Sequence, residues 1–411
     1  MTRKTTKYAA IVMILALVLG LFPVAGSSFA IEAKAVSDPA SVTMSEEIYE
    51  PPESRIVYNM NIDWRFHQGD VYGAEAVDFD DSGWQVVSVP HTFNDVDSFD
   101  EWITHDGEAS VWRGIVWYRK HFKLDESLAG KKVFIEFEGI RQAAYVYVNG
   151  QFVGRYEAGV TPFGFDLTDY VNFGDAGNVI AVKNDNTAVA ETGTGVSFQW
   201  NGRGFNPVYG GLTRDVKLYV LSDVYFTLPL YSNLQTYGTY IYPSEISTDD
   251  RTARINVESE IRNESASPRT VSLETVVVDM DGRAVKQISG ETAVLGAGET
   301  KVLRASDVMG DVKFWQPGYP YLYTVYNILR EEGEVKDVYP ITTGFRKVEF
   351  LGGFDQGGIY INNQLVYLSG YAQRSTNEWA LLGAATPQWI SDYDGAMMVE
   401  SNANLVRWMH I

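Results

Sequence analysis

Residues 133–153 read VFIEFEGIRQAAYVYVNGQFV. Positions 133, 135 and 137 are apolar, whereas Glu136 between them is charged, and this period of two is typical of a β-strand. A second apolar run, Ala144–Val148, is followed by Asn149-Gly150 and then by Phe152-Val153. Asn-Gly between two apolar runs is a strong hairpin signal, because both central residues of the tight turn need a positive φ. The stretch therefore predicts antiparallel β-structure.

The same pattern continues on both sides. From about Arg55 to Leu221 the chain consists of short alternating runs separated by turn residues, without a helical period of comparable strength. This predicts a β-sandwich. A second β-rich block runs from about Val224 to Thr343 and contains another hairpin signal, Asp281-Gly282. Its length of roughly 120 residues favours an immunoglobulin-like sandwich, although the chain has no cysteine for a core disulfide.

The pattern changes after Gly344. A hairpin is predicted over residues 358–368, which turn at Asn362-Asn363. Further along, Thr386 and Pro387 predict the start of a helix, with threonine as the N-cap and proline at the first helical position.

The predicted helix has one apolar face, which we expect to be a core stripe. The residues of this face are Ile390, Tyr393, Met397 and Met398. A strand-like run, Leu405–Trp408, follows the helix. Strand, helix and strand make one βαβ crossover. A closed barrel needs eight strands, so we expect an incomplete third domain.

The first residues predict an export signal. Arg3, Lys4 and Lys7 form a basic segment, and Ala9–Phe22 is an unbroken apolar run that is too short to span a bilayer. Small residues follow, with possible cleavage after Ala30 or after position 35. The alternative is an uncleaved membrane anchor. With cleavage, the protein is secreted and has no membrane contact.

Composition excludes several classes of function. The 411 residues carry a formal net charge of −20, with 33 Lys+Arg against 53 Asp+Glu, which argues against nucleic-acid binding by bulk charge. Cysteine is absent, which excludes disulfides, Cys-ligated zinc and a thiol nucleophile. Hydrophobic residues make up 45% and charged residues 21% of the chain, as in globular proteins.

Motifs for cofactors and metals are absent. The sequence has no H-E-x-x-H, no G-x-S-x-G and no Gly-rich phosphate loop before a helix, and we expect no cofactor and no metal. The acidic run 78–81 lacks the spaced ligands of a calcium loop, so a solvated turn is favoured over a metal site.

Three polar residues near the C-terminus are candidates for chemistry. Glu378, in Asn377-Glu378, could serve as a general acid or could be an ordinary solvated loop residue. Arg407 and His410 end the last predicted strand, on the face where barrel active sites lie. For Arg407 the alternative is a structural ion pair, because an arginine on a buried strand is costly unless it is paired.

A series of motifs in a fixed order runs from about Trp64 to the end of the chain. They are Trp64-Arg65-Phe66, Asp81-Ser82-Gly83-Trp84, Val89-Pro90-His91, Trp117-Tyr118-Arg119-Lys120, Gly139 through Val148-Asn149-Gly150, Gly210–Val216, Phe314-Trp315-Gln316-Pro317, Pro320–Tyr323, Gly344-Phe345-Arg346 and Asn404–His410. In this order and spacing the chain resembles the N-terminal part of glycoside hydrolase family 2, the family of β-galactosidases, β-glucuronidases and β-mannosidases.

The resemblance implies a mostly β protein with three structural domains. They are a jelly-roll-like sugar-binding β-sandwich, an immunoglobulin-like β-sandwich and the start of a (β/α)8 TIM barrel. The expected divisions are a signal peptide (1–35), a linker (36–54), the sugar-binding sandwich (55–221), the immunoglobulin-like sandwich (222–343) and the incomplete barrel (344–411).

The resemblance also implies a function: the N-terminal part of a secreted, retaining, β-galactosidase-like enzyme that cleaves terminal sugars from oligosaccharides or polysaccharides. The alternative is a non-catalytic secreted carbohydrate-binding protein built from the two sandwiches. The implied substrate contacts are Arg407, His410, Asn404, Arg374 and Asn206. The family uses two glutamates, one after the fourth barrel strand and one on the seventh. Both positions lie beyond Ile411, so no catalytic residue is expected in this chain, Glu378 included.

Two departures from the family pattern affect the substrate site. After the first barrel strand the family often has Gly-x-Asn-Arg-His, whereas this chain reads Gly370-Tyr371-Ala372-Gln373-Arg374-Ser375 and lacks the histidine. Before the signature at 210–216 the family commonly has an acidic residue, and Asn206 is here the one plausible polar substitute. The alternative for Asn206 is a turn residue, because Asn-Pro favours turns.

Overall fold

A computed structural model describes the chain over residues 47–94, 112–157, 159, 161–187, 209–353, 357–374, 382 and 385–409. Within these ranges the chain is mostly β, as predicted, with one α-helix. Among the same residues, no helix combines the length and the apolar character that crossing a membrane requires.

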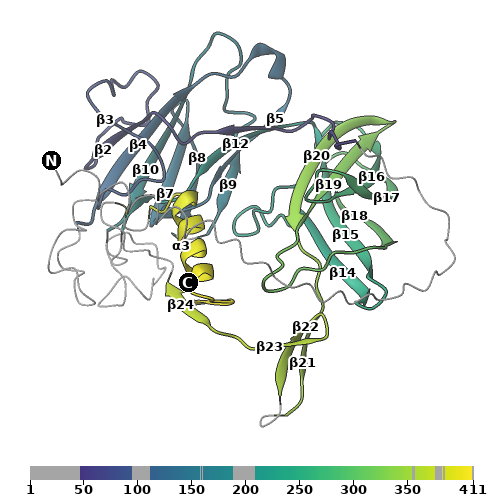
Figure 1. Ribbon diagram of the computed structural model, residues 1–411. Coiled ribbons are helices and arrows are strands. Elements are labelled where there is room, and N and C mark those ends of the chain that lie inside the picture. The colour runs from purple at the N-terminus through teal and green to yellow at the C-terminus, as the bar shows by residue number, and fades with distance from the viewer. Residues whose placement is uncertain are drawn as a thin grey trace, which may run out of the picture. The chain divides into compact units, whose positions relative to one another are not determined.

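The first sandwich consists of two antiparallel sheets (Figure 1). One sheet has the strand order β1-β12-β5-β9 and the other the order β3-β2-β4-β10-β7-β8, and β6 pairs with β11. The bounds are β1 (Ile56–Asn59), β2 (Trp64–Gln68), β3 (Gln85–Val87), β4 (Ile115–Phe122), β5 (Lys132–Phe137), β6 (Ile140–Arg141), β7 (Ala143–Val148), β8 (Gln151–Glu157), β9 (Phe163–Asp166), β10 (Asn178–Asp185), β11 (Gly211–Leu212) and β12 (Val216–Leu221).

The hairpin predicted from residues 133–153 is present. β7 and β8 pair in an antiparallel register and turn at Asn149 and Gly150, whose φ angles are +50° and +78°, as a tight turn of this kind requires. The apolar positions of β5 lie in the core of the sandwich with large aromatic residues such as Trp64 and Phe163. The opposite face of β5 does not face water, because Phe134 packs against a separate cluster with Tyr225, Leu228 and Leu230.

The second sandwich also consists of two antiparallel sheets. In one sheet β15 pairs with β13, β14 and β18, and the other has the order β17-β16-β19-β20. The bounds are β13 (Val224–Phe226), β14 (Thr239–Ser247), β15 (Thr252–Asn263), β16 (Arg269–Val278), β17 (Ala284–Leu295), β18 (Thr300–Met309), β19 (Tyr323–Glu331) and β20 (Glu334–Thr343). Its core is built from aliphatic side chains together with Phe226, Tyr323 and Phe345. Apolar packing thus holds the two sheets together, a role that a core disulfide shares in other sandwiches of this kind.

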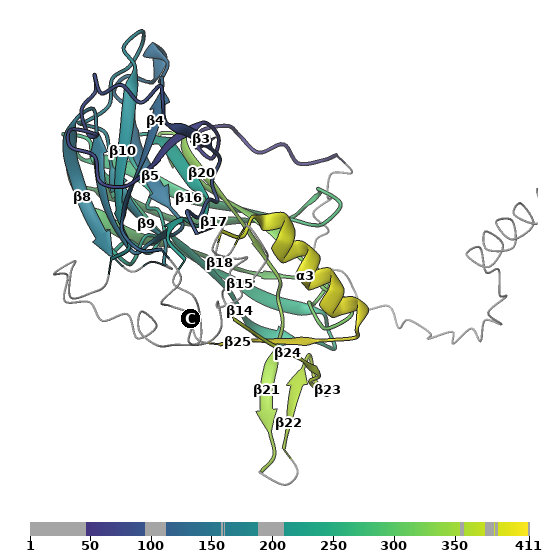
Figure 2. The ribbon, with the colours of Figure 1, turned by 90° about the vertical axis from the view of Figure 1, so that its left-hand side faces the viewer.

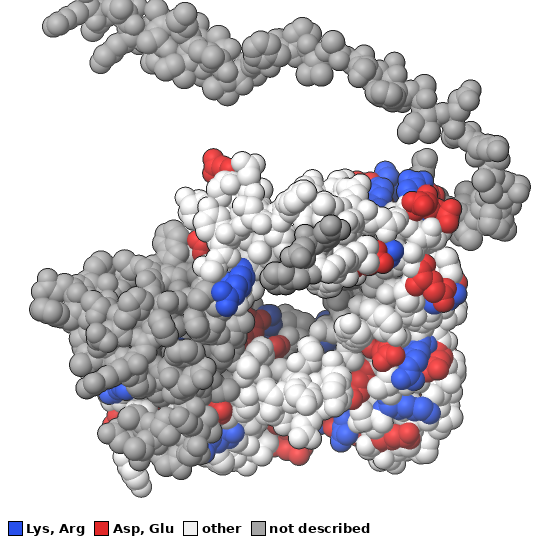
Figure 3. Space-filling view, turned by 90° about the horizontal axis from the view of Figure 1, so that it is seen from below, with Lys and Arg blue, Asp and Glu red and all other residues white. Residues whose placement is uncertain are grey.

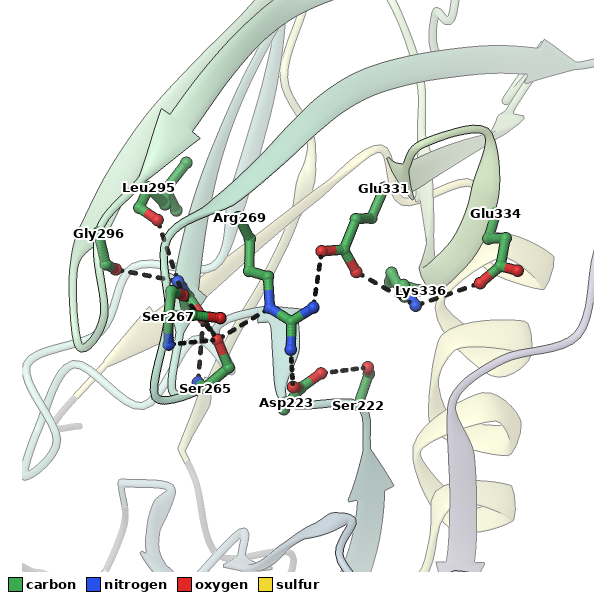
Figure 4. Close-up of polar contacts among 11 residues, drawn as sticks. Ser222, Asp223, Ser265, Ser267, Arg269, Leu295, Gly296, Glu331, Glu334 and Lys336 are labelled. Atoms are coloured by element: carbon green, nitrogen blue, oxygen red, sulfur yellow. Dashed lines mark hydrogen bonds and ion pairs between the residues drawn. The ribbon is translucent and has the colours of Figure 1, made fainter.

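Arg269 ties the connection between the sandwiches to the second one (Figure 4). Its guanidinium forms ion pairs with Asp223, just before β13, at 3.3 Å and with Glu331, at the end of β19, at 3.1 Å. Lys336 on β20 extends the network with ion pairs to Glu331 and Glu334. The charges on four segments are therefore satisfied by one connected set of contacts.

The segment before β1 contacts the second sandwich. Tyr49 donates its backbone N–H to the Gly282 carbonyl at 2.7 Å, and its ring packs 5.4 Å from that of Tyr326. Arg55, the residue before β1, reaches Asp337 on β20. Residues 49 and 55 therefore tie the start of the first sandwich to the second.

The last part of the chain contains one βαβ unit (Figure 2). The bounds are β21 (Val348–Leu351), β22 (Gly358–Ile361), β23 (Gln364–Val366), β24 (Gly370–Arg374), α3 (Gln388–Glu400) and β25 (Leu405–Met409). The predicted hairpin is formed by β22 and β23, which turn at Asn362 and Asn363, both with positive φ. β24 and β25 are parallel, whereas all other paired strands among the described residues are antiparallel. No barrel is closed by these strands.

The predicted helix is present, but its start was placed one residue too early. Pro387 is the N-cap, with an extended backbone at ψ 156°, and no side chain caps the helix. The Thr386 hydroxyl is buried and makes no hydrogen bond with a described residue, whereas an N-cap threonine would bond to the first turn. The carbonyl of Pro387 accepts the first helical bond, from Ile390.

Candidate functional site

The βαβ unit brings two of the predicted site residues to neighbouring strands. The parallel register places Arg407 of β25 beside Ala372 of β24, and Arg374 beside Met409 near the carboxyl ends of both strands. The Arg407 side chain is exposed and forms no ion pair with a described residue. The argument for a buried structural ion pair therefore does not apply to Arg407 in this chain.

Asn404 lies at the other end of the same strands, just before β25. Its side-chain oxygen accepts a hydrogen bond from the Ser369 amide at 2.9 Å, and its Nδ2 donates to the Tyr367 carbonyl at 2.8 Å. Its own amide donates to the Ser369 carbonyl. These three bonds hold the segment before β24 to the start of β25. They give Asn404 a structural task, while its implied contact with substrate stays a prediction.

The remaining predicted site residues lie outside what the structure describes. This holds for His410, for Asn206 and for the pair Asn377-Glu378, and for Arg374 only the backbone is described. The described residues contain no group of three or more histidine, aspartate or glutamate side chains able to hold a metal ion.

Side-chain contacts that the sequence did not reveal fix α3 against the two strands. Gln373 of β24 donates to Asp394 of α3 at 3.3 Å, and Tyr371 donates to Ser401 at the end of the helix at 2.9 Å. Gln373 stands within the stretch that departs from the family pattern. In this chain a residue of that stretch therefore contacts the helix.

The apolar stripe of α3 is buried only at its first position. Ile390 is fully buried, whereas Tyr393 is 51% and Met397 42% exposed. The prediction of a core stripe was wrong for these two residues, because only two strands of the described chain are available to cover the helix. Other apolar side chains of the helix and of its two strands are also exposed, namely Tyr371, Trp389, Val399, Leu405 and Trp408.

In the first sandwich, two of the family-like motifs meet in space. The His91 amide donates to the Leu212 carbonyl, and the Thr92 hydroxyl donates to the Gly210 carbonyl at 2.9 Å. Gly211 has a φ of +120°, and a Cβ there would lie 2.4 Å from the His91 carbonyl oxygen. Glycine is therefore required, because the two backbones approach too closely for a side chain.

Asp81 is not the solvated turn residue that its acidic run predicted. It is buried, forms an ion pair with the fully buried Arg119 at 2.7 Å and is hydrogen-bonded to His121 at 2.8 Å. Burial alone would raise its pKa, but the hydrogen bonds from Arg119 and His121 hold the pKa of Asp81 below its usual value. Its neighbour Asp80 does behave as a turn residue and accepts the Ser82 amide at 3.0 Å.

Comparison with known proteins identifies both sandwiches. Residues 57–222 match the sequence model of glycosyl hydrolases family 2, sugar binding domain, and residues 238–346 match that of glycosyl hydrolases family 2. A β-glucuronidase of Formosa agariphila is 41% identical over 87% of this chain and 36% of its own length. A β-galactosidase of Thermoanaerobacter pseudethanolicus is 32% identical over 87% of this chain and 44% of its own length.

Solved structures agree with the sequence comparisons. The structure of a β-glucuronidase from glycoside hydrolase family 2 superimposes with a TM-score of 0.82 at 40% identity, over 88% of this chain and 37% of that one. The chain thus spans less than half the length of these relatives. With both sandwiches matched in order and followed by a βαβ unit, the chain belongs to glycoside hydrolase family 2 and corresponds to the N-terminal part of its members.

Proposed function

We propose that this chain is the N-terminal part of a secreted, retaining β-glycosidase that removes terminal β-galactosyl residues from oligosaccharides or polysaccharides. The observation that carries the proposal is the parallel β24–α3–β25 unit directly after the two sandwiches. A protein that only binds carbohydrate has no need for the start of a barrel, whereas barrel enzymes build their active sites from the carboxyl ends of such strands.

The retaining mechanism belongs to this proposal. Two carboxyl groups held about 5 Å apart on opposite sides of the scissile bond act as acid/base and as nucleophile. We place both beyond Ile411, on later strands of the same barrel. Arg407 and His410 would then contact the sugar from the second strand, and Arg374 from the first.

Terminal β-glucuronides are a second candidate substrate. The supporting observation is that the relative with 41% identity and the superimposed structure with 40% identity are both named β-glucuronidases. A β-galactosidase matches at 32% identity over the same share of the chain.

Charge supports a substrate that is not a nucleic acid. The formal net charge is −20, and on the face shown in Figure 3 the Lys and Arg atoms of the described residues are scattered among Asp and Glu atoms. Such a surface offers no continuous basic patch for a phosphate backbone.

The test is to express the protein with its continuation past Ile411 and to assay nitrophenyl β-galactoside, β-glucuronide and β-mannoside. Turnover of the galactoside is expected, with the β-anomer of the sugar as the first product by proton NMR. Preferred turnover of the glucuronide would select the second candidate, and the α-anomer as first product would refute retention. Binding of glycans without any turnover would establish the non-catalytic alternative. Secretion is tested separately by mass spectrometry of the culture medium, where a mature N-terminus at Ile31 or Val36 is expected and an intact Met1 would refute export by cleavage.

A further inference from the structure

The outer face of the six-stranded sheet carries a second, smaller cluster. The segment between β2 and β3, residues 69–84, folds over part of this face, where Ala74 packs with Trp117 of β4 and Ala181 of β10. The fully buried Arg119 fixes the segment from below, because its guanidinium donates to the carbonyls of Ala74 and Ala76 and forms an ion pair with Asp81. The segment is therefore held in one conformation by the sheet beneath it.

A pocket of about 370 Å³ opens beside this segment. It is lined by Asp70, Val71, Tyr72, Gly73, Glu75, Trp117, Tyr147 and Lys183. This volume falls within the usual range for small-molecule sites, about 300–1,000 Å³.

The floor of the pocket is formed by the half-buried Tyr147 ring, beside Trp117, which is only 3% exposed. Trp117 of β4 stands directly opposite Lys183 of β10, and the Tyr147 ring of β7 lies 6.0 Å from that of Trp117. Phe152 of β8 continues the row, 5.4 Å from Tyr147, and is 53% exposed. At the rim, the Tyr72 side chain is fully exposed. Aromatic rings with one apolar face and a polar end suit a ligand that is itself apolar on one side and hydroxylated at its edge.

One carboxylate of the pocket is fixed in place. Asp70 accepts the Trp117 indole N–H at 3.0 Å and the Lys183 ammonium at 2.8 Å. Although partial burial acts against it, these two hydrogen bonds lower the pKa of Asp70, which is therefore charged at neutral pH. Preorganised polar groups of this kind lose little conformational freedom when a ligand binds.

Other polar groups of the pocket have unused hydrogen-bonding capacity. The hydroxyls of Tyr72 and Tyr147 and the carboxylate of Glu75 make no hydrogen bond with any described residue. Glu75 is close enough to Tyr147 to raise the pKa of its hydroxyl further, beyond the effect of burial. The pocket thus offers donors and acceptors side by side, which hydroxyl groups can satisfy in either role.

The charge of the pocket selects the class of ligand. Two carboxylates, Asp70 and Glu75, face one ammonium, Lys183, so the pocket carries an excess negative charge that disfavours an anionic group. A neutral pyranose ring meets all three demands, because it has an apolar C–H face, equatorial hydroxyls and no charge. We propose that this pocket on the first sandwich binds a neutral pyranose residue of a glycan. The site is separate from the barrel strands, and its binding does not depend on catalysis.

The test is to screen the purified 411-residue chain on an array of neutral and uronate-containing oligosaccharides. The dissociation constant for the strongest neutral glycan is then measured by calorimetry. Neutral pyranosides should bind in preference to uronates. Tyr72→Ala and Tyr147→Phe should each weaken the measured affinity by about threefold to tenfold.

The matched control is Tyr240→Ala. Tyr240 is 65% exposed and lies on β14 of the second sandwich, outside the pocket, so its replacement should leave the affinity unchanged. Tyr72 is fully exposed, and its variant should keep the melting temperature of the parent. The proposal is overturned if no neutral glycan binds, if uronates bind better, or if the Tyr72 and Tyr147 variants both bind like the parent. Because the readout is binding by this chain, a failure of the proposed hydrolysis would leave the result untouched.

Discussion

Replacing Arg55 with alanine is expected to lower the free energy of unfolding by about 3–5 kcal/mol, the usual cost of removing one partner of a buried ion pair. The Arg55 guanidinium meets the Asp337 carboxylate through two hydrogen bonds, at 3.1 and 2.6 Å. The exposed fractions of the two side chains are only 5% and 1%. Arg55→Ala would leave the Asp337 charge buried without a compensating cation.

The local contacts place the expected loss of unfolding free energy near the upper end of this range. Arg55 also donates to the Phe226 carbonyl at 2.9 Å, and Asp337 accepts the Phe226 amide at 2.9 Å. The guanidinium lies 4.6 Å from the centre of the Tyr339 ring. One side chain from the first sandwich thus satisfies the backbone and the carboxylate of two strands in the second.

The assay is equilibrium unfolding in urea, with two variants for comparison. The matched control is Arg251→Ala, which breaks an ion pair to Asp311 whose side chains are 63% and 84% exposed, and which should cost at most about 1 kcal/mol. Arg55→Lys should fall between the two, because an ammonium cannot reproduce the planar pair of bonds to Asp337. The reasoning is refuted if Arg55→Ala costs no more than Arg251→Ala.

Three further predictions concern single side chains. Asp81→Asn should lower the free energy of unfolding by about 1–3 kcal/mol at pH 7. Because its partners lower the folded-state pKa of Asp81, this loss should shrink as the pH falls through that pKa. A loss that is independent of pH in urea unfolding would contradict the ion pair. Burial raises the pKa of Glu136 above its usual 4.5, so the parent loses stability as the pH rises through the folded-state pKa. Glu136→Gln should therefore have a higher melting temperature than the parent at pH 7 and the same melting temperature near pH 4. A lower melting temperature of the variant at pH 7 would contradict this. In the protein that continues past Ile411, Arg407→Ala should lower kcat/KM by about tenfold or more at an unchanged melting temperature, since the side chain is exposed; unchanged kinetics would remove Arg407 from the site.

The sequence predicted those features that depend on neighbouring residues. In a strand with one buried face, apolar and polar residues alternate along the chain. The hairpins turn at Asn149-Gly150 and Asn362-Asn363, residue types that adopt a positive φ readily. The apolar period of the sequence predicted the helix at 388–400. These patterns are local, because the backbone geometry of each element fixes which side chains share a face.

Features that depend on distant residues were missed. Nothing near Asp81 in the sequence indicates that Arg119 of β4 will pair with its charge, so the acidic run resembled an ordinary turn. The sequence pattern of β5 likewise did not indicate that Phe134 on its opposite face is covered, because the covering cluster comes from residues 221–230. The exposure of Tyr393 likewise depends on which segments pack against the helix, and the apolar period of the helix carries no information about them.

Several residues of the motifs that revealed the family have structural tasks in this chain. Arg119 of the Trp-Tyr-Arg-Lys motif is fully buried and holds the segment over the sheet. Gly211 of the closing signature is required by a close backbone approach, and Asn404 links two segments of the barrel start. Residues with such tasks are constrained by folding whatever the substrate is, so they identify the fold and carry no information about the sugar. Specificity must then reside in residues without such a task, as proposed for the exposed Arg407. For this reason Tyr72 and Tyr147, which line the pocket of the first sandwich, are the positions to vary in search of a glycan contact.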